Sequence, residues 1–250
     1  MVINLLLLAS LGACIGSFSS MLMYRLPLIK GNNSIGLSYP RSHCPQCKSQ
    51  LKIRMLIPIF SYIFQTGKCA SCKNNIGIAY FLNEIIHVVA ILFVWMHFGF
   101  TIEACVHYLI FSIFYILFFL DLKYLYLPLL LNTSLIAIGL LTNFAMNTFA
   151  PIEEALVGLI AGYSSLWLIN KAFKLIKNKD GIGGGDFILL GGIGSIFGIY
   201  ALGPIVFLGS SISIVIFILS GSDKDDEIPL GSGLILGSII FYLIKIQLIQ

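Results

Sequence analysis

The sequence has few charged residues for its length. Of 250 residues, only 10% are Asp, Glu, Lys or Arg, whereas 58% are hydrophobic and the mean hydropathy is +0.97. Soluble domains are about 25% charged and about 45–50% apolar. The 15 basic and 11 acidic side chains could not cover the surface of a soluble protein of this size. The composition therefore excludes a large soluble catalytic domain.

Several functional motifs are also missing. The sequence has no HExxH metalloprotease motif, and His87, His97 and His107 stand among apolar residues without a convincing serine partner. The glycine run at 181–185 lacks the lysine and hydroxyl of a phosphate-binding Walker loop. No basic segment interleaved with aromatic residues is present, and basic loops of a membrane protein account for the net charge of +4. We therefore expect no nucleic-acid partner.

What the sequence does contain is a series of long uncharged stretches. Seven stretches of 16 to 36 residues carry no charge, and a membrane-spanning helix needs about 20 mostly apolar residues. The longest stretch, 187–222, has Gly198, Gly203 and Pro204 near its middle, which indicates a turn between two helices. We predict an all-α, polytopic membrane protein with about eight transmembrane helices, at 2–24, 80–99, 104–121, 127–147, 153–172, 186–200, 203–220 and 229–247. Seven spans plus a re-entrant segment is the alternative.

The basic residues predict the orientation of these spans. Lys and Arg accumulate on the cytoplasmic side of membrane proteins, and eight of them lie in the segment 25–79. With eight spans, 14 of the 15 basic residues fall on the same side as this segment. We expect an N-terminus outside and a cytoplasmic loop. The chain then divides into a first span (1–24), the loop (25–79) and a transmembrane core of about seven spans (80–250).

The loop contains two CxxC pairs, Cys44/Cys47 and Cys69/Cys72, separated by 21 residues. This spacing is close to that of a zinc ribbon, in which four thiolates complete a tetrahedral site. A short segment with few core residues would gain folding energy from such a metal. A redox dithiol or disulfides are the alternatives, but persistent disulfides are rare in the cytoplasm. We predict a small zinc-ribbon-like loop.

Two aspartates stand at the cytoplasmic boundary of predicted spans. Acidic residues at membrane depth are costly and mark functional candidates. Asp121 follows an apolar run, and a boundary residue paired with Lys123 is its simplest alternative reading. Asp186 follows the glycine run 181–185, and an ordinary helix N-cap is its alternative. The run is longer than a cap requires; glycines permit positive φ and close approach to another chain.

The predicted topology puts Asp121 and Asp186 at a similar depth on the same face. Two close carboxyl groups do not both ionise easily, so one keeps a proton while the other stays charged. The ionised group can take a proton from water while the protonated group polarises a scissile carbonyl. The two aspartates are therefore a candidate hydrolytic pair.

These features together resemble a known family, the type IV prepilin peptidases, which are polytopic aspartyl proteases of the GxGD class. The resemblance covers nearly the whole chain and rests on Gly16-Ser17-Phe18 through Tyr24-Arg25-Leu26-Pro27, the two CxxC pairs, Ile57-Pro58 with Ser61-Tyr62, Gly67-Lys68-Cys69, Asp121 with Pro128, and Gly183-Gly184-Gly185-Asp186. A single GxGD match would be weak evidence. Both aspartate motifs together with the cysteine loop are specific.

The resemblance implies an enzyme of the bacterial plasma membrane. It would cut the leader from prepilin and pseudopilin precursors at the cytoplasmic face, with Asp121 and Asp186 as the catalytic pair. Gly183 and Gly185 would form the catalytic-loop backbone. The resemblance also implies a zinc site of Cys44, Cys47, Cys69 and Cys72, and N-methylation of the new N-terminus with S-adenosylmethionine.

Glu84 matches a family glutamate that we assign to substrate positioning or methyl transfer, with helix capping or helix pairing as its alternative role. The chain departs from the family pattern at Ser20, Met55, Leu56, Phe81, Leu129 and Ile188. Both aspartates are kept, so the resemblance implies proteolysis more directly than methyl transfer. The other hypotheses are a transporter with a glycine-broken helix and a non-catalytic zinc-binding scaffold.

Overall fold

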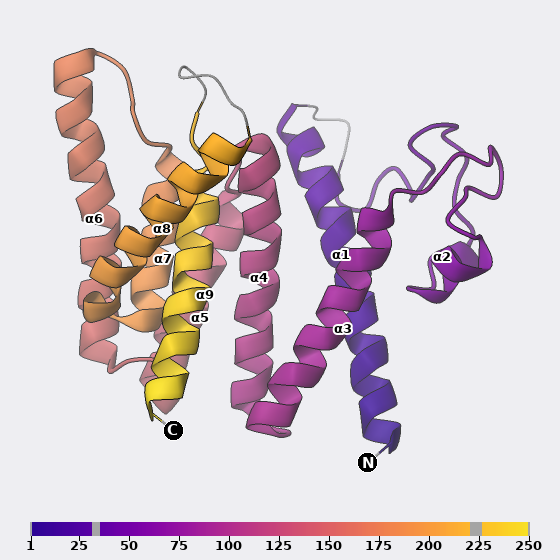
Figure 1. Ribbon diagram of the computed structural model, residues 1–250, viewed down its shortest axis with the longest axis horizontal. Coiled ribbons are helices and arrows are strands. Elements are labelled where there is room, and N and C mark those ends of the chain that lie inside the picture. The colour runs from indigo at the N-terminus through magenta and orange to yellow at the C-terminus, as the bar shows by residue number, and fades with distance from the viewer. Residues whose placement is uncertain (1, 32–35, 221–226, 250) are drawn as a thin grey trace. The chain divides into compact units, whose positions relative to one another are not determined.

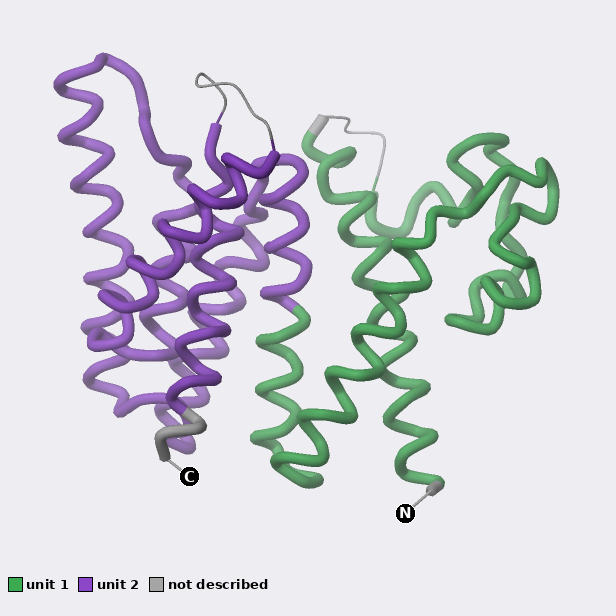
Figure 2. The backbone as a smooth tube through the Cα atoms, in the orientation of Figure 1, with its two compact units in different colours: residues 1–112 green, residues 113–250 purple. Residues whose placement is uncertain are grey.

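A computed structural model of the protein describes residues 2–31, 36–220 and 227–249. The chain divides into two compact units, residues 1–112 and 113–250, and one helix contributes to both (Figure 2). Among the described residues the regular structure is helical, apart from two isolated β-bridges in the cysteine loop. The predicted all-α class is therefore confirmed.

Unit 1 is built on two long helices that pack along each other. Its elements are α1 (Val2–Gly31), the 3₁₀ turn η1 (Ile53–Met55), α2 (Phe60–Phe64), α3 (Ile78–Phe98) and the first part of α4 (Ile102–Tyr124). The helices α1 and α3 cross side by side (Figure 1). A Cβ on Gly16 would lie 2.7 Å from the Cα of Glu84, so the small residue lets the two backbones approach.

Unit 2 is organised around α7. It contains the rest of α4 with α5 (Leu129–Met146), α6 (Ile152–Lys177), α7 (Gly184–Phe197), α8 (Ile199–Leu219) and α9 (Leu230–Ile249). Helix α7 packs against α5, α6, α8 and α9 (Figure 1), and every residue from Leu189 to Phe197 is buried. A Cβ on Gly194 would collide with the backbone of Gly158 on α6. The glycines of α7 therefore let it occupy the centre of the unit.

All eight segments expected to span the membrane are helices. Six of them, α1, α3, α4, α5, α6 and α8, are long and apolar enough to cross a bilayer by length and composition. Helix α7 has only 14 residues, and α9 is not among these six helices, so the count of eight spans stays a prediction. Within the described part of 187–222, up to residue 220, the two helices are separated by Gly198 alone, where φ is +81°. Gly203 and Pro204, which we had included in this turn, lie inside α8, because one positive-φ glycine suffices for the break.

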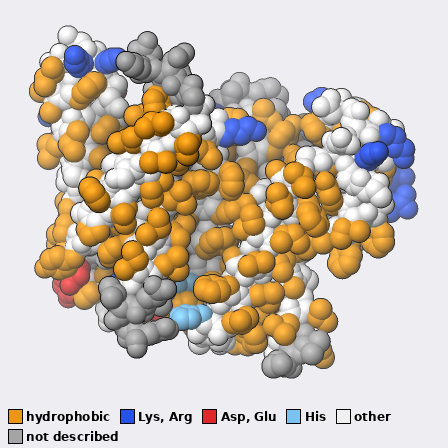
Figure 3. Space-filling view, viewed as in Figure 1, with side chains coloured by type: hydrophobic (Ala, Val, Ile, Leu, Met, Phe, Trp, Pro, Cys, Tyr) orange, Lys and Arg blue, Asp and Glu red, His pale blue; other side chains and the backbone are white. Residues whose placement is uncertain are grey.

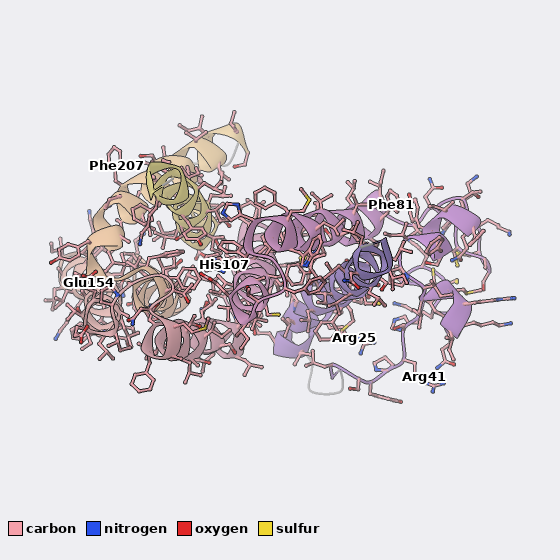
Figure 4. The ribbon with its side chains drawn as sticks, turned by 90° about the horizontal axis from the view of Figure 1, so that it is seen from below. Arg25, Arg41, Phe81, His107, Glu154 and Phe207 are labelled. Carbon is pink, nitrogen blue, oxygen red and sulfur yellow. The ribbon has the colours of Figure 1, made fainter. Side chains whose placement is uncertain are left out.

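The outer surfaces of the helices are apolar, as a lipid environment requires. Hydrophobic side chains cover the sides of the helices in both units (Figure 3). Phe207, for example, projects from α8 with 73% of its surface exposed (Figure 4). Soluble monomers rarely expose large contiguous apolar patches. Together with the six span-length helices, these apolar surfaces identify a multi-pass membrane protein.

Candidate active site

Asp121 lies in the last turns of α4 and belongs to unit 2. Only 4% of its surface is exposed. Its Oδ2 accepts two hydrogen bonds from Ser232, one from the backbone N–H at 2.5 Å and one from the hydroxyl at 2.7 Å. Lys123, the alternative partner considered from the sequence, lies over the ring of Tyr124 instead. Asp121 is therefore held by the first turn of α9, where the helix dipole favours negative charge.

Asp186 lies in the first turn of α7, in the same unit. It is not the N-cap, which is Gly183; instead the Asp186 carboxyl group accepts a hydrogen bond from the Gly183 backbone. This is the return half of a capping box. The other oxygen, Oδ1, is buried and has no hydrogen-bond partner among the described residues. A buried polar atom without a partner calls for a water, a ligand or a catalytic role.

The turn before Asp186 is held from two neighbouring helices. On α5, the fully buried Asn132 donates from Nδ2 to the carbonyl of Gly185 at 3.2 Å. On α6, Asn170 accepts the backbone N–H groups of Gly181 and Ile182 at 2.8 and 3.0 Å. These bonds fix the backbone at both ends of the glycine run 181–185.

The glycine run serves close packing and not unusual backbone angles. None of the glycines from 181 to 185 has a positive φ, so that part of the sequence expectation is wrong. A Cβ on Gly185 would lie 2.8 Å from the Cβ of Leu127. A Cβ on Gly184, by contrast, would meet nothing within 4 Å. The close approach that we expected therefore applies to Gly185.

Leu127 also connects the surroundings of the two aspartates. Its side chain lies against Gly185, which precedes Asp186, and against Gly231. A Cβ added to Gly231 would lie 2.9 Å from Cδ1 of Leu127 and 3.0 Å from Cγ of Asp121. Both aspartates therefore lie close to the same leucine side chain. The fold thus brings together the two aspartates that the sequence singled out, 65 positions apart.

The four cysteines of the loop gather at one point in unit 1. The sulfurs of Cys44, Cys47, Cys69 and Cys72 all lie within 4.8 Å of one another, and none is in a disulfide. Each CxxC pair forms the same turn. Lys48 donates its backbone N–H to Cys44 at 2.9 Å, and Lys73 donates to Cys69 at 2.9 Å. The two turns face each other like the knuckles of a four-cysteine metal site.

Hydrogen bonds prepare two of these thiols for a metal. The side chain and backbone of Ser49 lower the pKa of Cys47 to about 6. Backbone hydrogen bonds from Cys72 and Ser71 lower the pKa of Cys69. Because the thiolate is the metal-binding form, this donor set fits a metal ion.

Glu84 lies on α3 in unit 1 and is buried. Its Oε2 accepts the backbone N–H of Ile59 at 2.6 Å, and its carboxyl group also bonds to the side chain of Ser17. Ile59 has φ +62° and ψ −59°, with Phe60 N–H bonded to the carbonyl of Pro58 at 2.6 Å. This is a γ-turn with positive φ, a rare and strained conformation for a β-branched residue.

Glu84 also lines a cavity of about 250 Å³ between α1, α3 and the cysteine loop. Arg25, on α1, lies in the same wall and donates to the carbonyls of Gly36, Leu37 and Pro40 at 2.6 to 3.0 Å (Figure 4). The cavity wall also includes four positions where the chain departs from the family pattern: Ser20, Met55, Leu56 and Phe81. Four of the six departures thus gather around one cavity.

Comparison with known proteins decides the family. Residues 10–98 match the bacterial peptidase A24 N-terminal domain, and residues 108–219 match the type IV leader peptidase family. A prepilin leader peptidase/N-methyltransferase from Neisseria gonorrhoeae is 33% identical over 94% of this chain and 89% of its own length. The chain belongs to the type IV leader peptidase family. Both aspartates lie in the second match, and the cysteines and Glu84 lie in the first.

Other members of the leader peptidase family are similarly close. Proteins with the same name from Pseudomonas aeruginosa and Klebsiella pneumoniae are 32% and 35% identical, covering 88% and 80% of this chain and 83% and 87% of their own lengths. No solved structure matches the chain.

Sequence reasoning missed Ser232 and Asn132, two polar side chains that hydrogen-bond to Asp121 and to the Gly185 carbonyl. The only sequence signal near Ser232 is Pro229, because a proline often stands at the start of a helix and would place Ser232 in the first turn of the last apolar helix. Neither residue stands in a motif, because each acts on a distant part of the chain.

Proposed function

We propose that this protein is a membrane aspartic endopeptidase that removes the leader peptides of prepilins and pseudopilins. The observation that carries the proposal is that Asp121, which is buried, and Asp186, whose Oδ1 is buried, lie in unit 2 around the same side chain, Leu127. Packing alone does not require two such acids. In this role the transmembrane core, residues 80–250, holds the peptidase site. Gly183 and Gly185 form its loop. The positive-inside pattern favours cleavage at the cytoplasmic face of the bacterial plasma membrane, with the N-terminus outside.

The reaction follows from the chemistry of two close carboxyl groups. The ionised carboxylate takes one proton from water, and the resulting hydroxide attacks the scissile carbonyl carbon while the protonated carboxyl group donates to its oxygen. The C–N bond then breaks, and a proton passes to the departing amine. The products are a free leader carboxyl group and a new pilin N-terminus, with one water consumed.

The direct test is incubation of the purified enzyme with a prepilin, followed by intact-mass analysis. Asp121→Asn and Asp186→Asn each keep side-chain volume but remove the acid. We expect neither variant to cleave. A normal yield of inserted protein separates lost chemistry from lost folding.

The cysteine cluster and the Glu84 cavity support a second activity. Four thiolates at this spacing suit a structural zinc ion, held by Cys44, Cys47, Cys69 and Cys72. The cavity beside this cluster is lined mainly by apolar groups, with the carboxylate of Glu84 and the guanidinium of Arg25 in its wall, so it suits a ligand that has both apolar and charged parts. S-adenosylmethionine would supply a methyl group for the new pilin N-terminus. Repeating the prepilin assay with and without it measures this activity as a mass increase of one methyl group.

A further inference from the structure

Ser232 stands outside the sequence motifs but hydrogen-bonds directly to Asp121, one member of the proposed catalytic pair. It lies in the first turn of α9 and is fully buried. Its backbone N–H and its hydroxyl both donate to Oδ2 of Asp121, at 2.5 and 2.7 Å. The hydroxyl oxygen also lies 3.2 Å from the carbonyl of Phe118, one turn before Asp121 on α4. Ser232 therefore binds both the carboxylate and the helix that carries it.

The two donors have a specific consequence for the geometry of the carboxylate. Both act on the same oxygen, so rotation of the carboxylate about its Cβ–Cγ bond would break both hydrogen bonds. A hydroxyl has one proton, and hydrogen bonds to a charged acceptor are stronger than those to a neutral carbonyl. With Asp121 ionised, the Ser232 hydroxyl donates to Oδ2, and Oδ1 is the oxygen left for chemistry.

We infer that Ser232 is a positioning residue of the peptidase site, which holds Oδ2 of Asp121 so that Oδ1 takes the proton of the attacking water. The inference rests on the proposed function. Ser232 touches neither water nor substrate in this role; it acts through Asp121. When Oδ1 gains a proton, Asp121 becomes neutral, and the Ser232 hydroxyl can turn toward the carbonyl of Phe118. The same side chain thus serves both protonation states without leaving a buried donor unpaired.

A matched pair of serines on α9 tests this inference. Ser238 is also fully buried on the same helix, and its hydroxyl donates to the carbonyl of Leu234 at 2.7 Å. Ser232→Ala and Ser238→Ala therefore each remove one hydroxyl group from a fully buried position on α9. Only the Ser232 hydroxyl contacts an aspartate. Ser232→Gly removes the hydroxyl together with the methylene, which separates the hydrogen bond from packing.

We expect Ser232→Ala and Ser232→Gly to lower the kcat of prepilin cleavage by about tenfold, equivalent to about 1.4 kcal/mol in the barrier. KM should stay within about twofold of wild type, because the lost bond orients the acid and not the substrate. Ser238→Ala should keep both kcat and KM.

Three outcomes would overturn the inference while wild type cleaves. One is a kcat of Ser232→Ala within about threefold of that of Ser238→Ala. Another is a change confined to KM. The third is a loss in Ser232→Gly that greatly exceeds the loss in Ser232→Ala, which would indicate packing. Failure of wild type to cleave, or cleavage by Asp121→Asn, would instead overturn the proposed function, so the two failures are distinguishable.

Discussion

The backbone N–H of Ile59 donates a 2.6 Å hydrogen bond to the carboxylate of Glu84. This bond ties a strained γ-turn in the cysteine loop to α3, a span-length helix of unit 1. Strained turns persist where the surrounding structure holds them, and they cluster at functional sites. Glu84 therefore has a structural role in the wall of the cavity, beside the role in substrate positioning or methyl transfer that we propose for it.

Glu84→Gln and Glu84→Ala separate these two roles. Gln keeps an oxygen that can accept the N–H of Ile59, whereas Ala removes the acceptor of this part-buried hydrogen bond to a carboxylate, at a cost of about 1–3 kcal/mol. We expect Glu84→Ala to lower the Tm and to weaken metal retention by the loop, and Glu84→Gln to do neither. Loss of methyl transfer in both variants would show that the charge itself is needed. Loss in Ala alone would assign Glu84 to the turn.

Adjacent glycines in the GxGD motif provide a second prediction. A Cβ on Gly185 would meet Leu127 at 2.8 Å, but a Cβ on Gly184 would meet nothing within 4 Å. Gly185→Ala should displace the turn that carries Asp186, with an overpacking cost of about 1–3 kcal/mol and a large loss of prepilin cleavage. Gly184→Ala, in the first turn of α7, should be tolerated. Equal activities of the two variants would show that contact with Leu127 does not position Asp186.

The cysteine cluster should hold one zinc ion per chain, measured by elemental analysis of the purified protein. Cys44→Ser should lose the metal and destabilise the loop, because the ion supplies folding energy. Leader cleavage should fall less than any methyl transfer, since both aspartates lie in the other unit. Zinc-free protein with four reactive thiols would contradict the metal assignment.

Metal binding by the loop should weaken in acid. Protons compete with the metal for thiolates, and hydrogen bonds from Ser49 place the pKa of metal-free Cys47 at about 6. A backbone hydrogen bond from Asn74 lowers the pKa of Cys72, but burial and the neighbouring cysteine thiols outweigh it and raise this pKa to about 11. Apparent zinc affinity should therefore already fall below pH 8, and fall more steeply below about pH 6, where Cys47 is protonated as well. Zinc release followed with a chromogenic chelator between pH 8 and pH 5 measures the profile. A flat profile across this window would argue against thiolate ligation by Cys47.

Much of the candidate site could be predicted from the sequence, because its residues belong to short motifs or are rare charges within apolar segments. The CxxC spacing predicted the clustering of Cys44 and Cys72, and the scarcity of charge singled out Asp121 and Asp186. Ser232 could not be predicted, since it lies 111 positions from Asp121 and meets it only through helix packing. The sequence pattern also leaves the number of spans open, because α7, with 14 residues, falls short of the length that identifies a span.

Intact-mass analysis of a prepilin after incubation with wild type, Asp121→Asn and Asp186→Asn tests the central claim most directly. The account predicts that wild type releases the leader, that neither variant does, and that all three insert with equal yield. Release of the leader by either variant at a rate near that of wild type would contradict the assignment of Asp121 and Asp186 as the catalytic pair.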